Sequence, residues 1–299
     1  KEKLTSANAV VQAATIIAIL SGIFVFSMMF EQGLAGVTFI NEQEILQIIS
    51  PLGWVLVACA ILELLFTFKL QPTKTESPEL VFDWGSYGRG KYLKNNFGKI
   101  LGNRNIWLSI IGLSIFWGIS QVVLAAFPAF AKDTMGLTNT VVIQGMMACS
   151  GIGIIIGSII AGRSSRDYIE TGLVPLGTVG VVVALFLMPQ LHSTTLMAAD
   201  FLLLGISGGI FIVPLNALIQ FHAKDSELGT VLAGNNWIQN IVMLGFLVLT
   251  VLFAVNGIGS IGLFNLLIVA GLAGALYTIY QLPQSLVRYV IARLFASTH

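Results

Sequence analysis

Charged side chains are scarce in this sequence: 10% of its 299 residues are Asp, Glu, Lys or Arg, whereas 56% are hydrophobic. A soluble domain carries about 25% charged residues, so this scarcity excludes an ordinary soluble domain. The formal net charge is only +1 and no dense basic block occurs, which excludes a typical nucleic-acid-binding protein. The composition therefore predicts an integral membrane protein.

Residues that form catalytic and metal centres are also few. The two cysteines, Cys59 and Cys149, lie in apolar segments, where buried packing is their simplest role. The three histidines, His192, His222 and His299, lie in predicted loops or at the chain end, which favours solvated side chains over metal ligands. No nucleophile elbow, acyltransferase His and Asp pair or Walker loop occurs. The sequence thus predicts no enzyme, no cofactor and no metal site in this segment.

Long hydrophobic runs are abundant instead. Eight apolar segments reach the ~20 residues that cross a bilayer core of ~30 Å. They cover residues 9–30, 47–68, 106–130, 139–161, 172–190, 195–220, 229–254 and 258–281. Connections on the side of the N-terminus carry fourteen of the fifteen Lys and Arg residues, and the other side carries only Lys132. By the positive-inside rule, both ends of the chain are predicted to be cytoplasmic.

A long polar connection divides these segments into two and six. Residues 70–105 are predicted to form a central cytoplasmic loop after the last two helices of an N-terminal bundle, in residues 1–69. Residues 106–282 are predicted to form a C-terminal six-helix bundle, and residues 283–299 an amphipathic cytoplasmic tail. Two six-helix bundles joined by a basic loop are a known transporter plan. On that plan the eight helices are helices 5–12 of twelve, and the tail leads into a missing domain.

Amide side chains interrupt the apolar segments, most densely in residues 201–240. Asn216 and Gln220 lie one helical turn apart, and after a charged turn Asn236 and Asn240 do the same. An unsatisfied amide costs several kcal/mol in hydrocarbon, so these side chains should face protein or a water-filled cavity. Two interpretations stay open: a substrate cavity, and hydrogen bonds between neighbouring helices.

Two further positions are candidates for the same cavity. Gln12 shares a helix face with Asn8 and Thr15 and is predicted to line the cavity. The alternative is that Asn8 caps a helix and Gln12 lies among lipid headgroups. Trp117 and Gln121, one turn apart, present an aromatic ring beside an amide, which suits an amphiphile headgroup; ordinary helix packing is the alternative.

Two carboxylates lie in apolar segments. Glu63 is about 9 Å deep from Lys69 at ~1.5 Å per residue. It is either a coupling or gating carboxylate or the structural partner of a basic group on another helix. Asp200 lies near the outer end of its segment, which favours an interfacial position over a coupling site.

A glycine-rich segment ends in a basic motif. Gly153 and Gly157 have the GxxxG spacing, which permits close approach of two helices. Gly157 also begins the run GSIIAGRSSR, which resembles the loop motif that the major facilitator superfamily repeats between helices 2 and 3 and between helices 8 and 9. The resemblance implies that Arg163 ends helix 8 and stabilises a closed state through a cytoplasmic charge network. Ser165 and Asp167 depart from the glycine and the basic residue of that motif.

Longer segments resemble the lysophospholipid transporter branch of that superfamily. They are FWGISQ (116–121), ETGLVPLG (170–177), VPLNALIQ (213–220) with the pair NN at 235–236, and LTSANAVVQAATIIAILSG (4–22). The resemblance implies outer-to-inner transfer of lysophospholipids across the bacterial cytoplasmic membrane, where they are reacylated. It also implies a fused or associated glycerolipid acyltransferase and acyl carrier protein synthetase, into which residues 286–295 would lead. Leu124 stands where stand-alone members carry a basic residue.

The sequence therefore predicts an all-α polytopic membrane protein of the major facilitator type that transports lysophospholipids by alternating access. The predicted substrate contacts are Gln12, Trp117, Gln121, Asn216, Gln220, Asn236 and Asn240, and the predicted coupling or gating residues are Glu63 and Arg163. Two alternative functions stay open. One is an exporter of drugs or other small amphiphiles from the same superfamily, and the other is a membrane anchor for a fused acyltransferase.

Overall fold

The computed structural model describes residues 4–34, 42–69, 83–165 and 168–281, and the predicted tail at 283–299 lies outside them. The chain forms two compact units, one of Lys1–Ile16 with Asp83–His299 and the other of Ile17–Phe82. Helix α1 (Leu4–Leu34) begins in the first unit and continues into the second, which also contains α2 (Glu42–Thr67).

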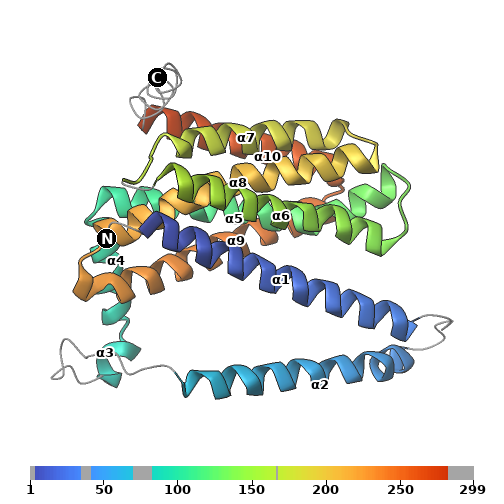
Figure 1. Ribbon diagram of the computed structural model, residues 1–299, viewed down its shortest axis with the longest axis horizontal. Coiled ribbons are helices and arrows are strands. Elements are labelled where there is room, and N and C mark those ends of the chain that lie inside the picture. The colour runs from blue at the N-terminus through green and yellow to red at the C-terminus, as the bar shows by residue number, and fades with distance from the viewer. Residues whose placement is uncertain (1–3, 35–41, 70–82, 166–167, 282–299) are drawn as a thin grey trace. The chain divides into compact units, whose positions relative to one another are not determined.

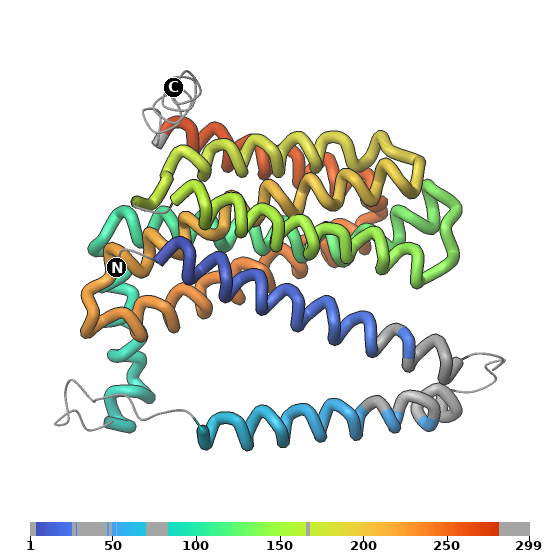
Figure 2. Tube along the Cα trace, viewed as in Figure 1, coloured from blue at the N-terminus to red at the C-terminus, as the bar shows by residue number. Residues whose placement is uncertain are grey.

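Six long helices make up most of the first unit (Figure 1). They are α5 (Arg104–Asp133), α6 (Thr140–Ser164), α7 (Leu173–Leu187), α8 (Thr194–His222), α9 (Leu228–Val255) and α10 (Ser260–Gln281), with short 3-10 helices η1 (Met188–Gln190) and η2 (Asp225–Glu227) in the turns. Successive helices run antiparallel, so α5, α7 and α9 begin at the end of the bundle where α6, α8 and α10 finish (Figure 2). Each of the eight predicted segments falls on α1, α2 or one of these six helices, which confirms the all-α fold.

Seven helices in the described part of the chain are long and apolar enough to cross a membrane. They are α1 and α5 to α10, with η1 extending α7 and η2 extending α9. The apolar part of α2, Gly53–Thr67, is shorter, although the helix itself has 26 residues. The protein is therefore a multi-pass helical membrane protein, as its composition predicted.

Glycines let α6 and α8 approach until their backbones are in contact. A Cβ atom added at Gly157 would overlap the carbonyl oxygen of Ile206, and one added at Gly205 would overlap the carbonyl oxygen of Ser150. Gly153 and Gly209 meet backbone atoms of the opposite helix in the same way. The GxxxG spacing in α6 therefore gives close helix packing, as predicted.

Phenylalanines fill the interior of the bundle at the end where α5 finishes and α8 and α10 begin. Phe127, Phe130, Phe201 and Phe264 are completely buried. The rings of Phe127 and Phe201 meet edge to face with 4.6 Å between centroids, and those of Phe130 and Phe264 do so at 5.3 Å. Such pairs contribute about 0.5–1.5 kcal/mol each beyond the area that they bury. The interior is closed at this end.

Two short helices lie in the range predicted to be a connecting loop. They are α3 (Trp84–Gly88) and α4 (Lys91–Leu101). Helix α4 packs on α9, because Ile100 is 1% exposed and the rings of Phe97 and Trp237 meet edge to face at 5.4 Å. Lys99 Nζ lies 3.3 Å from a carboxylate oxygen of Glu227. The sequence did not predict these helices, since their apolar stripe is too short to stand out from the polar residues around it.

Candidate functional site

The first turns of α1 contact α6 and α8 within the first unit. Asn8 Nδ2 donates to Gln220 Oε1 at 3.2 Å, and Gln220 Nε2 donates to Asn8 Oδ1 at 2.9 Å. The next residue, Ala9, is buried beside Gly162, where an added Cβ atom would lie 3.0 Å from the Ala9 Cβ atom. A small apolar cluster surrounds this contact and consists of Ala9, Ala161, Leu173 and Val213. Asn8 therefore does not cap a helix; its amide pairs with that of Gln220.

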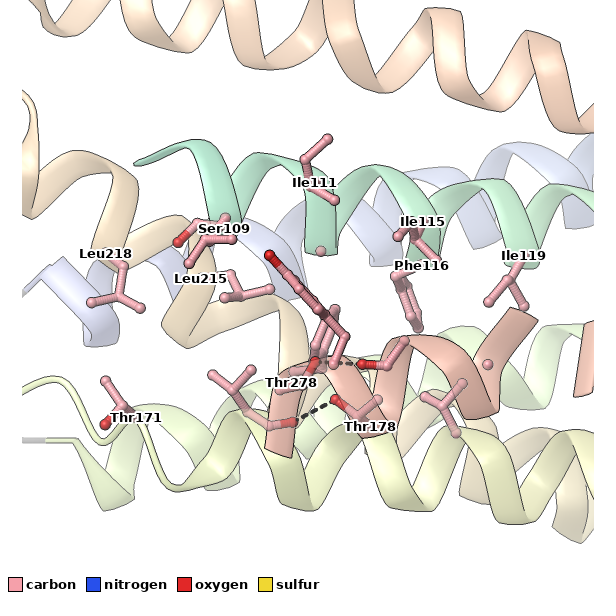
Figure 3. Close-up of a pocket in the computed structure, with 18 of the residues that line it drawn as sticks. Ser109, Ile111, Ile115, Phe116, Ile119, Thr171, Thr178, Leu215, Leu218 and Thr278 are labelled. Carbon is pink, nitrogen blue, oxygen red and sulfur yellow. Dashed lines mark hydrogen bonds between the residues drawn. The ribbon is translucent and has the colours of Figure 1, made fainter. Parts of the chain in front are cut away.

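A cavity of about 290 Å³ lies inside the bundle between α5, α7, α8 and α10 (Figure 3). Along α5 it extends from Asn105 to Ile119, which is about 21 Å at ~1.5 Å per residue. Most of its wall is aliphatic or aromatic, with Phe116 and Leu215 among the lining residues. Gly274 of α10 leaves part of the space open, because no heavy atom lies within 4 Å of a Cβ atom added there. The cavity is long, narrow and mainly apolar.

A hydrogen-bonded histidine lies at the end of the cavity where α5 begins and α8 finishes. His222 Nδ1 is 2.9 Å from the carbonyl oxygen of Leu218, and His222 Nε2 is 2.9 Å from Asn105 Nδ2. Because a carbonyl oxygen can only accept, Nδ1 carries the proton and Nε2 accepts from the amide of Asn105. His222 is half-buried in the last turn of α8, so the prediction of a solvated loop histidine was wrong for this residue.

Hydroxyl groups add neutral polarity to the cavity wall. Ser109, Thr178 and Thr278 each donate a 2.8 Å hydrogen bond to the carbonyl oxygen four residues earlier in their own helix. Their oxygen atoms remain available as acceptors. Among the described residues that line the cavity, none is Asp, Glu, Lys or Arg. The cavity therefore offers hydrogen bonds and apolar contact but no fixed charge.

The predicted substrate contacts do not line this cavity. Trp117, Gln121 and Asn216 are half-buried on α5 and α8, while Asn236 and Asn240 are exposed on α9. Asn240 Nδ2 donates to the backbone oxygen of Asn236 at 2.8 Å. Gln12 is half-buried on α1, one turn after Asn8. Gln220 of α8, which is hydrogen-bonded to Asn8, is also half-buried. Of these seven residues, Gln220 is the one whose described side chain is hydrogen-bonded to a side chain of another helix, namely to Asn8 of α1.

The residues at the polar end of the cavity were not identified from the sequence. Their only signal is spacing: Asn105 and Ser109 are four residues apart, so this pair shares a helix face. Ser and Thr are also common packing residues in membrane helices, where they bond to their own backbone. This spacing alone could not distinguish a cavity wall from a packed interface.

The two predicted coupling or gating residues lie apart in the chain. Glu63 is exposed on α2 in the second unit. Arg163 is exposed in the last turn of α6, next to the Gly162 position that meets Ala9. Their coupling and gating roles remain predictions.

Asp200 of α8 is buried inside the bundle, which contradicts the predicted interfacial position. Its side chain is 4% exposed, and neither carboxylate oxygen has a hydrogen-bond partner among the described residues. The sequence could not show this burial, because it follows from the packing of other helices around α8 rather than from the distance to the end of the segment. A carboxyl group without partners lowers the stability of the fold around it.

Replacing Asp200→Val is expected to raise the melting temperature of the full-length protein in detergent. The substitution removes a buried polar group without partners, a group that typically costs about 1–3 kcal/mol. Asp200→Asn is the matched control, because the amide is also polar and has the same shape as the carboxyl group. Little change in melting temperature is expected for it. A lower melting temperature for Asp200→Val would mean that the carboxyl group holds a stabilising partner.

Antiparallel membrane-length helices around an internal cavity define a polytopic helical membrane protein. The sequence profile of the Major Facilitator Superfamily matches residues 1–246, and the chain belongs to that superfamily. This match confirms the family resemblance found in the sequence.

The chain is also similar to bacterial proteins named lysophospholipid transporter LplT. The protein of Citrobacter koseri is 29% identical over 282 residues, which cover 90% of this chain and 65% of the relative. Those of Salmonella arizonae and Escherichia coli K12 are 33% and 32% identical over 171 residues, which cover 54% of this chain and 42% and 43% of the relatives. The chain thus spans less than two thirds of the length of these relatives. No solved structure matches the chain.

Proposed function

We propose that the protein is a secondary transporter that moves lysophospholipids across the bacterial cytoplasmic membrane for reacylation, by alternating access. The similarity to proteins named lysophospholipid transporters supports this cargo. The structural observation that carries the proposal is the set of amides on the surface of apolar helices. Gln121, Asn216, Asn236 and Asn240 are half-buried or exposed there. In a membrane such groups need protein or water beside them, so this surface faces a second bundle or a polar path.

In this proposal α1 and α2 are helices 5 and 6 of a twelve-helix transporter, and α5 to α10 are helices 7–12. Residues 1–69, 70–105 and 106–282 are then the end of the first bundle, the cytoplasmic loop and the second bundle. The distribution of Lys and Arg supports cytoplasmic positions for both ends of the chain. The bonds between Asn8 and Gln220 then join helix 5 to helix 10 near the cytoplasmic surface.

Alternating access assigns a role to this contact. Asn8, Ala9, Gly162 and Gln220 close the cytoplasmic side in the present conformation and separate when the protein opens toward the cytoplasm. Arg163 lies beside Gly162, which is the position expected of a gating residue. Two amide hydrogen bonds contribute about 0.5–1.5 kcal/mol each, which is enough to bias a conformational equilibrium and small enough to break in each cycle.

The headgroup of the lysophospholipid is proposed to contact Gln12, Trp117, Gln121, Asn216, Gln220, Asn236 and Asn240. Leu124 supplies no positive charge for the phosphate, so recognition depends on these neutral hydrogen-bonding groups and on the helices outside this chain. An acyltransferase and an acyl carrier protein synthetase, fused or associated, are the proposed partners, because transferred lysophospholipid must be reacylated.

Transport of fluorescent lysophosphatidylethanolamine by the full-length protein in proteoliposomes tests the proposal. Unlabelled lysophospholipid is expected to compete, whereas cationic drugs are not. Gln121→Ala and Asn216→Ala are expected to slow transport about tenfold, equal to ~1.4 kcal/mol, which is typical of a lost hydrogen bond to a charged group. Asn256→Ala, at the end of α9, is the control and should not slow it. Competition by drugs alone would favour an exporter, and transfer no faster than in empty vesicles would favour a membrane anchor.

A further inference from the structure

We propose that the cavity between α5, α7, α8 and α10 binds one single-chain amphiphile with a zwitterionic headgroup, as a site separate from the transport path. The identity of that amphiphile as a lysophospholipid rests on the proposed function. The number of acyl chains and the absence of a charge requirement rest on the cavity alone.

The cavity is a side pocket because it does not continue through the bundle. Its lining on α5 ends at Ile119, and beyond it the buried rings of Phe127 and Phe130 meet Phe201 and Phe264. None of the amides proposed to contact the transported headgroup lines the cavity. The cavity therefore ends within the bundle, short of these phenylalanine rings.

The polarity of the lining changes along its length as an amphiphile requires. Asn105 and His222 lie at the end where α5 begins and α8 finishes. Ser109 follows on α5, and Ile115, Phe116 and Ile119 continue toward the other end (Figure 3). At the polar end the second amide hydrogen of Asn105 can donate to a phosphate oxygen, and the hydroxyl oxygen of Ser109 can accept from a glycerol hydroxyl, whereas both nitrogens of His222 are already bonded to Leu218 and Asn105. The rest of the lining is mainly apolar, with the hydroxyls of Thr178 and Thr278 bonded to their own helices, and it removes an acyl chain from water.

The dimensions of the cavity select a single chain. One leaflet of a bilayer with a ~30 Å hydrocarbon core is about 15 Å thick, so a cavity about 21 Å long accommodates one chain and part of a headgroup. Its volume of about 290 Å³ is just below the ~300–1,000 Å³ of typical ligand pockets. A second acyl chain would need space that the surrounding helices fill.

The headgroup preference follows from the missing charge. No Lys or Arg lies among the described residues that line the cavity, so the carboxylate of a fatty acid would have no counter-ion there. A zwitterionic headgroup carries its own counter-ion, because its positive group lies beside its phosphate. The polar end lies where α5 begins and α8 finishes, on the side that the basic residues assign to the cytoplasm, so the occupant comes from the inner leaflet.

Photoaffinity labelling of the full-length protein in nanodiscs tests this site. A lysophosphatidylethanolamine with a photoreactive group in its chain is expected to label peptides of α5, α7, α8 or α10 that line the cavity. Gly274→Leu fills the open space and should reduce this labelling at least fivefold. Gly245→Leu is the matched control, because Gly245 of α9 also has no atom within 4 Å of an added Cβ atom but does not line the cavity.

Competition identifies the occupant. Excess unlabelled lysophosphatidylethanolamine should suppress labelling at least fivefold, whereas palmitate and diacyl phosphatidylethanolamine should suppress it less than twofold. Equal suppression by palmitate or the diacyl lipid, or equal labelling of the two leucine variants with unchanged melting temperatures, would overturn the proposal. Labelling is independent of transport, so a protein that binds at this site without moving lysophospholipid would contradict the proposed function and leave this site standing.

Discussion

Oxidation of the full-length protein carrying Ala9→Cys and Gly162→Cys is expected to stop lysophospholipid transport, and reduction to restore it. An added Cβ atom at Gly162 lies 3.0 Å from the Ala9 Cβ atom, and disulfides hold Cβ atoms about 3.5–4.5 Å apart, so a small shift brings the pair into bonding geometry. The bond would hold α1 against α6 and prevent the cytoplasmic side from opening. Transport should fall to the rate of empty vesicles.

Three controls make this result specific. The natural cysteines, Cys59 and Cys149, are first replaced by serine and alanine, and transport by this background is measured. Each single-cysteine variant should transport lysophospholipid equally well with and without oxidant. Complete disulfide formation, measured by loss of free thiols, together with undiminished transport would show that this contact does not open during the cycle.

Replacing Gly205→Ala is expected to be strongly destabilising for a single added methyl group. The methyl carbon would overlap the carbonyl oxygen of Ser150, a backbone atom that moves only if α6 and α8 separate. Overpacking of this kind costs about 1–3 kcal/mol, occasionally more. At ~2–4 °C per kcal/mol, the melting temperature of the full-length protein should fall by about 2–12 °C.

Gly145→Ala provides the matched control for that experiment. Gly145 also lies inside a helix of the α6–α8 pair, but no heavy atom lies within 4 Å of an added Cβ atom. Alanine there should be neutral or stabilise by about 0.5–1 kcal/mol through helix propensity. If Gly205→Ala melted at the same temperature as Gly145→Ala, the close backbone contact between α6 and α8 would be wrong.

The helices could be predicted because a membrane-spanning segment leaves a direct trace in the sequence. The segment predicted at 195–220 became Thr194–His222, and that at 229–254 became Leu228–Val255. Helix α4 is harder to predict from the sequence. It packs on α9 through Ile100 and Phe97, which are only one helical turn of apolar side chains.

The candidate site could be predicted only in part, because local sequence patterns do not show which distant residues contact each other. Asn8 and Gln220 each stood out as an amide in an apolar segment, but the bond between them joins residues 212 apart in the sequence. The cavity has no comparable signal in the sequence. It depends on the empty space beside Gly274, which has no side chain, and on which helices pack around that position. Burial of Asp200 likewise depends on which helices surround α8.

Transfer of lysophosphatidylethanolamine between the leaflets of proteoliposomes containing the full-length protein is the most direct test of the proposed function. A headgroup-labelled lipid that becomes protected from an external quencher reports this transfer as it happens. We expect protection to be faster than in empty vesicles, to saturate with lipid concentration and to stop when the cysteine pair at positions 9 and 162 is oxidised. Protection at the rate of empty vesicles, or equal transfer of a diacyl phospholipid, would contradict lysophospholipid transport by this protein.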